Sequence, residues 1–273
     1  MSDDLQLLVL DIDGTIAGQS NQISATVLNA IQSARDKGIR IAIATGRMYC
    51  SALRFHREVG SDLPLSAYQG AWIQDPASDR LHQHLPVDPQ TAHQLLDYFE
   101  QPELRSRLSV HCYIGDRLYV RHLSDETRLY AQRADIDPIP VGDLRQVLHR
   151  EPTKVLALSH DTDLIDRLFG TLRQHYTPAE LYITKSVATF FEATNPFVSK
   201  GEAVRYLAED LLGIGANNVM AIGDNFNDLE AIEYAGTGVA MGNAPDEVKA
   251  VAQWVAPDVE QDGAAAAIEE FLL

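Results

Sequence analysis

The sequence is poor in cysteine, in positive charge and in long apolar runs, and each shortage excludes a class of protein. Only 2 of the 273 residues are cysteine, Cys50 and Cys112, and they form no CxxC pair, so we expect reduced, packed thiols in a cytoplasmic protein. Lysine and arginine number 22 against 39 aspartate and glutamate, a formal net charge of −17, which argues against nucleic acid and anionic membranes as partners. No apolar run is long enough to span a bilayer.

The remaining bulk properties are those of an ordinary soluble protein. Apolar residues make up 45% of the chain and charged residues 22%, and 273 residues suffice for one large domain or two smaller ones. The start, Met1-Ser2-Asp3-Asp4, carries no basic segment, so no signal peptide is expected. An acidic chain can still bind an anionic small molecule, because local cations decide what a pocket binds.

Both ends of the chain alternate between strand and helix patterns. The first part predicts strands over 7–10, 39–44 and near 65–68, with helices over 23–34 and 48–59. From about residue 195 the pattern resumes, with helices over 200–212 and 229–235, strands over 219–222, 238–241 and about 254–255, and a final helix around 264–267. Such alternation favours a parallel sheet with helices on both of its faces.

The middle of the chain has a different pattern. Residues 109–114 and 117–122 are strand-like and flank Gly115-Asp116, a two-residue hairpin signal. Further strands are predicted over 154–159, 181–184 and 189–194, and helices over 91–100, 125–134 and 161–175. We therefore expect an α/β core, residues 1–80 and 191–273, interrupted by an α+β domain, residues 81–190, with a largely antiparallel sheet.

Two acidic clusters follow apolar strands at opposite ends of the chain. Asp11 and Asp13 lie in an Asp-Ile-Asp-Gly-Thr segment directly after the first strand, and Asp224 and Asp228 lie in Gly-Asp-Asn-Phe-Asn-Asp directly after the strand over 219–222. Ligands of open α/β sheets bind where the strands end. Carboxylates brought together there repel each other unless a cation lies beside them, and magnesium is the predicted ion.

Such a pair of acids also has a chemical interpretation. A carboxylate at a strand end can act as a nucleophile towards phosphorus, and Asp11 fits that role. Asp13, two residues on, could donate a proton to the leaving oxygen and later take one from water. Asp224 would join Asp11 on the metal, and Asp228 would orient its ligands. A lone Asp-x-Asp is more often a solvated turn, but the second cluster makes that alternative much weaker.

Two further segments could bind an anion. Thr45, Gly46 and Arg47 follow a strand and open a helix, which places a hydroxyl, an unobstructed amide and a guanidinium where a phosphate or substrate could bind. Taken alone, this segment is a weak signal, and an ordinary helix cap is the better interpretation. Lys200 opens another helix, where the macrodipole disfavours a cation, so it makes sense if it faces Asp11 and an incoming phosphate. The alternative is a flexible surface lysine.

Taken together and in order, these four segments resemble the motifs of the haloacid dehalogenase (HAD) superfamily. The long insertion between the threonine and lysine motifs resembles the class IIB cap of the Cof-type phosphatases. The segment Phe191-Glu192-Ala193-Thr194, leading into Val198-Ser199-Lys200-Gly201, is similar to that subfamily's entry to its lysine helix. The resemblance spans nearly the entire chain and implies a HAD-like Rossmannoid parallel-sheet core with an inserted α+β cap.

The resemblance also implies a role for each motif residue. It implies Asp11 as nucleophile, Asp13 as general acid/base, and magnesium held by Asp11, the Asp13 carbonyl and Asp224, with Asp228 in support. It implies a phosphoryl group bound by Thr45, Gly46 and Lys200 with help from Asn227. One departure is Gln69, which stands before Gly-Ala where the subfamily usually has asparagine, so specificity inferred from relatives is less safe.

The sequence therefore predicts a magnesium-dependent phosphatase of small phosphorylated metabolites, in particular sugar phosphates. It predicts an aspartyl-phosphate intermediate and a monomer or small homo-oligomer. A phosphosugar mutase is the rival among enzymes, and a bisphosphate requirement would distinguish it. A phospho-accepting signalling module also pairs acids with a threonine and a lysine, but it needs no large insertion. A catalytically idle binding protein is disfavoured because every reactive position is filled.

Overall fold

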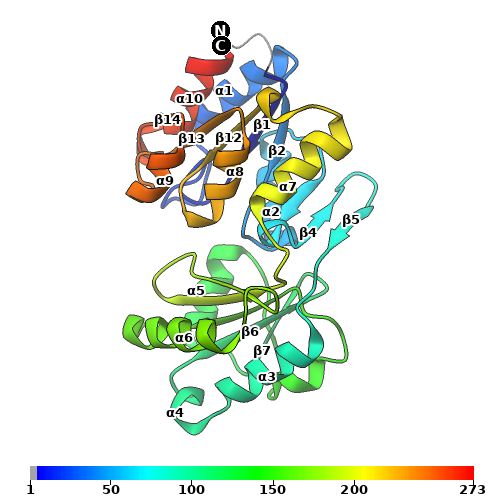
Figure 1. The fold of residues 1–273 in the computed structure, drawn as a ribbon, viewed down its shortest axis with the longest axis vertical. Helices are drawn as coiled ribbons and strands as arrows, with labels where there is room; N and C mark the ends of the chain where they lie inside the picture. The colour runs from blue at the N-terminus through cyan, green and yellow to red at the C-terminus, as the bar shows by residue number, and fades with distance from the viewer. Residues whose placement is uncertain (1–4) are drawn as a thin grey trace. The chain divides into compact units, whose positions relative to one another are not determined.

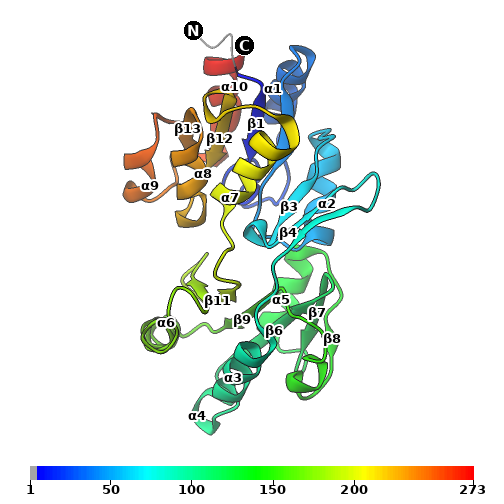
Figure 2. The ribbon, with the colours of Figure 1, turned by 45° about the vertical axis from the view of Figure 1, so that its right-hand side comes forward.

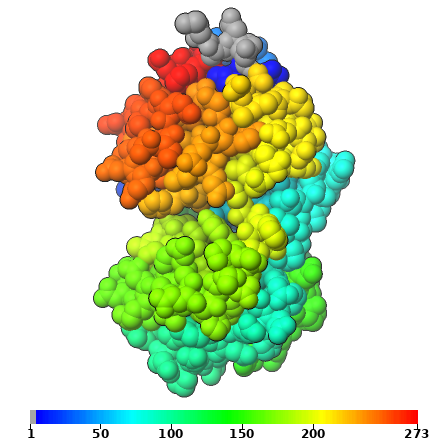
Figure 3. Space-filling model, viewed as in Figure 1, coloured from blue at the N-terminus to red at the C-terminus, as the bar shows by residue number. Residues whose placement is uncertain are grey.

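The structure, a computed structural model, describes residues 5–273 and divides into two compact units. The first comprises residues 5–83 and 199–273, and the second comprises residues 84–198. In the first unit the N-terminal and C-terminal segments adjoin one another, as the neighbouring yellow and cyan surfaces in Figure 3 show. The expected lack of a signal peptide concerned residues 1–4, which lie outside the described residues.

A five-stranded parallel sheet forms the centre of the first unit, with strand order β14-β13-β12-β1-β2 (Figure 1). Its strands are β1 (Leu7–Leu10), β2 (Arg40–Ile43), β12 (Val219–Gly223), β13 (Thr237–Ala240) and β14 (Trp254–Val255). In β1, Leu7 lies opposite Val219 on one side and Arg40 on the other. β1 is therefore the central strand, and the carboxyl ends of β12 and β2 flank its own.

Helices cover both faces of this sheet, and as a result every residue of β1 is buried. They are α1 (Ala25–Asp36), α2 (Tyr49–Glu58), α7 (Lys200–Arg205), α8 (Leu229–Tyr234), α9 (Asp246–Val251) and α10 (Gly263–Leu272). Alternate strand residues such as Leu7 and Val9 pack with Val204 of α7 and Ala231 of α8. Helices α1 and α10 pack against each other (Figure 2). The predicted fold class is confirmed.

One helix of the first unit differs from the predicted element. The helix predicted over 200–212 is α-helical only to Arg205, and it continues as a π-helical stretch, Tyr206–Leu212, to a left-handed Gly213. After β2 and α2 the chain also forms a small sheet of β3 (Leu65–Ala67), β4 (Trp72–Gln74) and β5 (Leu81–His84), in that order. A tight turn over Tyr68–Gly70 joins β3 to β4.

The second unit is an α+β layer with strand order β10-β11-β9-β6-β7-β8. Its strands are β6 (Ser109–Ile114), β7 (Arg117–Val120), β8 (Ile139–Pro140), β9 (Lys154–Leu158), β10 (Tyr182–Thr184) and β11 (Phe190–Thr194). Its helices are α3 (Pro89–Phe99), α4 (Pro102–Arg105), α5 (Asp125–Ala134) and α6 (Thr162–His175). Among these neighbours only β7 and β8 are parallel, so the prediction of a largely antiparallel sheet is confirmed.

Strand β11 spans one of the predicted domain boundaries, between residues 190 and 191. The boundaries themselves remain a prediction. The expected core resumes at residue 191, yet Phe191 to Thr194 lie in β11, which pairs with β9 of the second unit. The physical reason is that a strand belongs with the strands it hydrogen-bonds to. The apolar alternation of residues 190–194 does not identify those partners.

The two faces of the second sheet carry different chemistry, because side chains alternate along each strand. One face is apolar and packs with α3 and α6 through residues such as Cys112, Val155 and Phe191. The opposite face carries a buried ion pair between Lys154 and Glu192, whose Nζ and Oε2 are 2.9 Å apart.

His111 lies on the same face of that sheet as the ion pair and is fully buried. Its Nε2 lies 2.9 Å from Oγ1 of Thr127, a residue of α5. Burial, helped by the charge of Lys154, lowers the pKa of His111 from 6.5 to about 3. The folded protein therefore holds this imidazole in its neutral form at neutral pH.

The low pKa of His111 predicts acid sensitivity. The unfolded chain takes up a proton at this residue as pH falls below 6.5, whereas the folded chain resists protonation down to about pH 3. The free energy of unfolding should therefore fall by roughly 2 kcal/mol between pH 7 and pH 5 through this group alone. Urea unfolding of a His111→Gln variant should show a correspondingly weaker pH dependence. The exposed His93→Gln control should follow the wild type, and equal slopes for all three proteins would contradict the prediction.

Candidate active site

The carboxyl ends of two adjacent strands bring the predicted acids together. Asp11 follows β1 directly, and its amide donates to the Ile222 carbonyl at 3.1 Å, so β1 stays paired to β12 as far as the site. Asp224 follows β12. Carboxylate oxygens of Asp11, Asp224 and Asp228 all lie within 4.8 Å of one another. Three acids this close form a candidate site for a hard cation.

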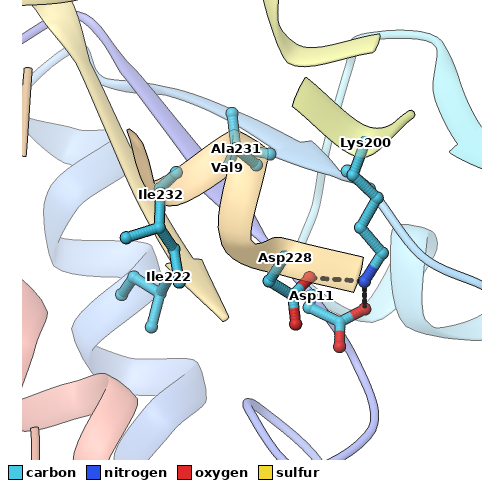
Figure 4. A pocket seen from close by; sticks show the side chains of 9 residues that line it. Val9, Asp11, Lys200, Ile222, Asp228, Ala231 and Ile232 are labelled. Atoms are coloured by element: carbon cyan, nitrogen blue, oxygen red, sulfur yellow. Dashed lines mark hydrogen bonds and ion pairs between the residues drawn. The ribbon is translucent and has the colours of Figure 1, made fainter. Parts of the chain in front are cut away.

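Lys200 places its ammonium between two of these acids. It is the first residue of α7, and its Nζ lies 2.8 Å from Oδ1 of Asp11 and 2.5 Å from Oδ1 of Asp228 (Figure 4). The lysine side chain is only 1% exposed, so it is not the flexible surface lysine that the sequence also allowed. The Lys200 ammonium group is therefore buried within the acidic cluster and paired with it.

Asp228 fixes the second acidic loop as well as the lysine. Its Oδ2 accepts hydrogen bonds from the backbone amides of Asp224 and Asn225, both at 3.0 Å. The carboxylate thus holds the turn that carries Asp224, while its other oxygen meets Lys200. Asp228 ends the short turn that precedes α8, which brings its carboxylate back to these amides.

The site is short of positive charge. Burial raises the pKa of Asp11 to about 7 against the opposing effect of Lys200. Burial and the neighbouring Asp11 raise the pKa of Asp224 to about 8. Burial alone would lower the pKa of Lys200, but Asp11 and Asp228 outweigh it and hold that pKa above its ordinary value. Apolar side chains close the inner side of the cluster (Figure 4), namely Val9, Ala44, Ala221, Ile222, Ala231 and Ile232.

Gly14 allows the two acidic loops to approach. Its φ of +78° lies in the left-handed region that other residues disfavour. A Cβ at this position would lie 2.1 Å from Oδ2 of Asp224, which is an impossible contact. The glycine after Asp13 is therefore required by the approach of Asp224 and not only by the turn.

Asp13 and Arg47 form a pair of their own at the edge of the cluster. Arg47 donates Nε to Oδ2 of Asp13 at 2.7 Å and Nη2 to Oδ1 at 2.6 Å, and Nη2 also reaches Oδ1 of Asn21 at 2.6 Å. The Asp13 side chain remains 44% exposed. Its carboxylate does not belong to the three-acid cluster, and its predicted carbonyl contact to a metal stays a prediction. Nη1 of Arg47 is buried without a hydrogen-bond partner among the described residues.

The predicted phosphate loop follows β2, on the other side of β1. Oγ1 of Thr45 accepts from the Arg47 amide at 3.2 Å, and α2 begins shortly afterwards at Tyr49. A Cβ built on Gly46 would lie 3.8 Å from Nδ2 of Asn227, so that amide borders the loop. Oδ1 of Asn227 is buried and has no hydrogen-bond partner among residues 5–273. The contacts of Thr45, Gly46 and Asn227 with a phosphoryl group remain a prediction.

Asn243 is a site residue that the sequence reasoning missed. Its Nδ2 donates to the Gly14 carbonyl at 2.9 Å and to Oδ2 of Asp224 at 3.1 Å, and its Oδ1 accepts from the Val259 amide at 3.0 Å. It thereby joins both acidic loops. The available signal was its position after β13, the neighbour of β12, at the same edge of the sheet.

Acids at the ends of adjacent parallel strands, with a buried lysine between them, define an α/β enzyme whose site can accept a cation and an anion. The chain matches the model of the haloacid dehalogenase-like hydrolases over residues 8–268. A 5-amino-6-(5-phospho-D-ribitylamino)uracil phosphatase of Bacillus subtilis, YitU, is 30% identical and is aligned over 97% of each chain. The protein therefore belongs to the haloacid dehalogenase-like hydrolase family.

Solved structures share the whole fold. A haloacid dehalogenase-like hydrolase from Bacteroides thetaiotaomicron has a TM-score of 0.86 at 24% identity, over 97% of this chain and 99% of that one. A HAD subclass IIB sugar phosphatase has a TM-score of 0.81 at 20% identity, over 97% and 98%. The resemblance inferred from the motifs, to Cof-type members with a class IIB cap, is confirmed.

The position of Lys200 predicts a large loss of stability when its charge is removed. Lys200→Met would leave Asp11 and Asp228 buried without a cation, which typically costs about 3–5 kcal/mol. Urea unfolding at pH 8 should show this loss. At pH 6 the loss should be smaller, because Asp11, with its pKa of about 7, can then bind a proton instead. The matched variant Lys249→Met, on α9, should change stability by less than about 0.5 kcal/mol, and equal effects of the two variants would contradict the prediction.

Proposed function

We propose that the protein is a magnesium-dependent phosphatase that hydrolyses small phosphorylated metabolites through an aspartyl-phosphate intermediate. The observation that carries the proposal is the contact of Lys200 with Asp11 inside the three-acid cluster. A buried carboxylate beside a cation, at the edge of a parallel sheet, suits attack on a phosphorus atom that carries negative charge. The family and the phosphatase names of relatives such as YitU support the same reaction.

The residues present fit a magnesium ion. The oxygens of Asp11, Asp224 and Asp228 are close together, and the raised pKa values of Asp11 and Asp224 reveal negative charge that Lys200 does not neutralise. Asp11 and Asp224 would hold the ion, with the Asp13 carbonyl, while Asp228 supports them. When bound, magnesium supplies charge neutralisation to the phosphoryl oxygens and to the attacking carboxylate.

In the first step Asp11 attacks phosphorus in line with the ester bond. The new bond joins a carboxylate oxygen of Asp11 to phosphorus, while the bond from phosphorus to the ester oxygen breaks. Lys200, Thr45 and Gly46 hold the phosphoryl oxygens. Both oxygens of Asp13 accept hydrogen bonds from Arg47, which favours the ionised carboxylate. One of these contacts therefore has to break before the Asp13 carboxyl can carry a proton and give it to the departing alkoxide.

In the second step water hydrolyses the acyl phosphate. Asp13 takes a proton from water as the water oxygen attacks phosphorus, and the bond from phosphorus to Asp11 breaks. Inorganic phosphate leaves, and both aspartates return to their starting states. The 44% exposure of the Asp13 side chain supports access of water to this base.

The substrate class is a phosphate monoester of a sugar or of a polyhydroxylated chain. The YitU relative is named for a substrate with a phosphate on a ribityl chain, at 30% identity over nearly the full length.

Asp11→Asn should abolish phosphate release while leaving the fold intact, because an amide oxygen is a far weaker nucleophile than a carboxylate. The measurement is release of inorganic phosphate from a panel of sugar and polyol phosphates, with magnesium and with a chelator. Acid-quenched wild type should gain one phosphoryl group by mass spectrometry, and the variant should not.

The exposed Asp246→Asn variant is the matched control and should keep full activity. Appreciable turnover by Asp11→Asn would overturn the covalent scheme. Undiminished activity in chelator would overturn the metal requirement. Formation of an isomeric sugar phosphate without free phosphate would instead support the mutase alternative.

Asn243→Ala should weaken magnesium binding, because Asn243 ties Asp224 to the Gly14 carbonyl. Loss of a residue that orients a metal ligand typically costs about 10- to 100-fold in metal affinity. The magnesium concentration that gives half-maximal activity should rise by that factor, while kcat at saturating magnesium changes much less. Asn29→Ala, an exposed variant on α1, is the control. An unchanged magnesium dependence, or a fall in kcat alone, would contradict this role.

A further inference from the structure

The turn between β3 and β4 has an unusual backbone. Tyr68, Gln69 and Gly70 have successive φ values of 50°, 59° and 97°, all in the left-handed region. Glycine adopts this region readily, whereas tyrosine and glutamine do not. Strained backbone of this kind persists only where the surrounding structure holds it, and it is concentrated at functional sites.

Hydrogen bonds fasten this turn to the predicted phosphate loop. The Tyr68 amide donates to the Arg47 carbonyl, and the Gln69 amide donates to the Thr45 carbonyl, both at 2.8 Å. The two carbonyls that accept these bonds belong to the residues immediately before and after Gly46. The strain at Gln69 is therefore imposed by attachment to the loop that is proposed to bind the phosphoryl group.

The other side of the turn packs against the beginning of α7. A Cβ at Gly70 would lie 2.7 Å from the Ser199 carbonyl oxygen and 3.0 Å from Cβ of Ala203. Ser199 immediately precedes Lys200, which reaches Asp11. Gln69 is thus held between the loop of Thr45 and Gly46 and the helix that carries the lysine.

The Gln69 side chain lies next to Gly46 and Asn227. The residue is 3% exposed, and its backbone amide is already paired with the Thr45 carbonyl. A Cβ built on Gly46 would lie 3.6 Å from Nε2 of Gln69 and 3.8 Å from Nδ2 of Asn227. Oδ1 of Asn227 is buried and without a partner among the described residues. Two side-chain amides therefore border Gly46, and the oxygen of the Asn227 amide has no partner in the described part of the chain.

The unpaired Oδ1 of Asn227 is unfavourable for the free protein, since buried polar groups normally have hydrogen-bond partners. Asparagine or glycine would also suit the left-handed backbone better than glutamine. Backbone preference does not explain Gln69, whereas a ligand bound beside Gln69 and Asn227 does, because it would supply Oδ1 of Asn227 with a partner.

We propose that Gln69 is a specificity-determining residue which, with Asn227, binds a hydroxyl group of the substrate's leaving group next to the phosphoryl group. This inference rests on the proposed phosphatase function. Amides donate and accept hydrogen bonds, and so does a hydroxyl group. A phosphoryl oxygen could use only the donors and would leave Oδ1 of Asn227 without a partner. The neutral amide pair therefore suits a hydroxylated carbon chain, while Lys200 serves the phosphoryl charge.

The test compares two phosphate monoesters, sorbitol 6-phosphate, which carries hydroxyl groups, and phenyl phosphate, which carries none. Gln69→Leu keeps the approximate size of the side chain and removes its hydrogen bonds. The ratio of kcat/KM for sorbitol 6-phosphate to that for phenyl phosphate should fall about tenfold or more. Gln32→Leu, on the exposed face of α1, is the matched control and should leave that ratio unchanged.

Gln69→Asn provides a second variant that suits the left-handed backbone. Its melting temperature should equal or exceed that of the wild type, while the substrate ratio still falls, because the shorter amide no longer reaches the hydroxyl group. Equal losses for both esters, or an unchanged ratio in both folded variants, would overturn this inference alone. A wild-type enzyme that hydrolyses neither ester with magnesium would overturn the proposed function, and this inference with it.

Discussion

The buried contact of Lys200 with Asp11 and Asp228 is the interaction on which the rest of the site depends. Removing charged groups from water costs several kcal/mol per ion, and only close pairing offsets that cost. The contact joins residues from the end of β1, the start of α7 and the start of α8, which are far apart in the sequence. The contact that pairs these charges therefore depends on all three segments being in place.

The remaining charge of the site explains its proposed chemistry. One lysine faces three acids, and the pKa values of Asp11 and Asp224 rise because burial disfavours charge that lacks a counterion. A phosphoryl group would add further negative charge to this cluster. The proposed magnesium ion would offset this charge when the substrate binds. The chain's net charge of −17 gives no long-range attraction for an anion, so local cations must provide it.

Much of this arrangement was predictable because parallel strands align their carboxyl ends. Asp11, Asp224 and Thr45 each follow an apolar strand, and the sheet places those strands side by side. Side-chain partners at longer range were not predictable. The sequence does not indicate that Arg47 reaches Asp13, or that Asn243 joins the two acidic loops, because both depend on rotamers and on loop paths. The strained turn at Gln69 was hidden for the same reason, since its hydrogen bonds to the Thr45 loop are tertiary.

The two buried lysines of this chain show why excess acid distinguishes a reactive site from a structural ion pair. Lys154 meets a single carboxylate, and although burial alone would raise the pKa of Glu192, Lys154 and Ser186 hold it below its ordinary value. That pair is balanced and needs no further ion. Lys200 is shared between Asp11 and Asp228, and Asp224 adds a third acid nearby. The same physical cost of burial thus gives a balanced ion pair in the second unit and, in the first, an acidic cluster with excess negative charge, where we propose that a cation binds.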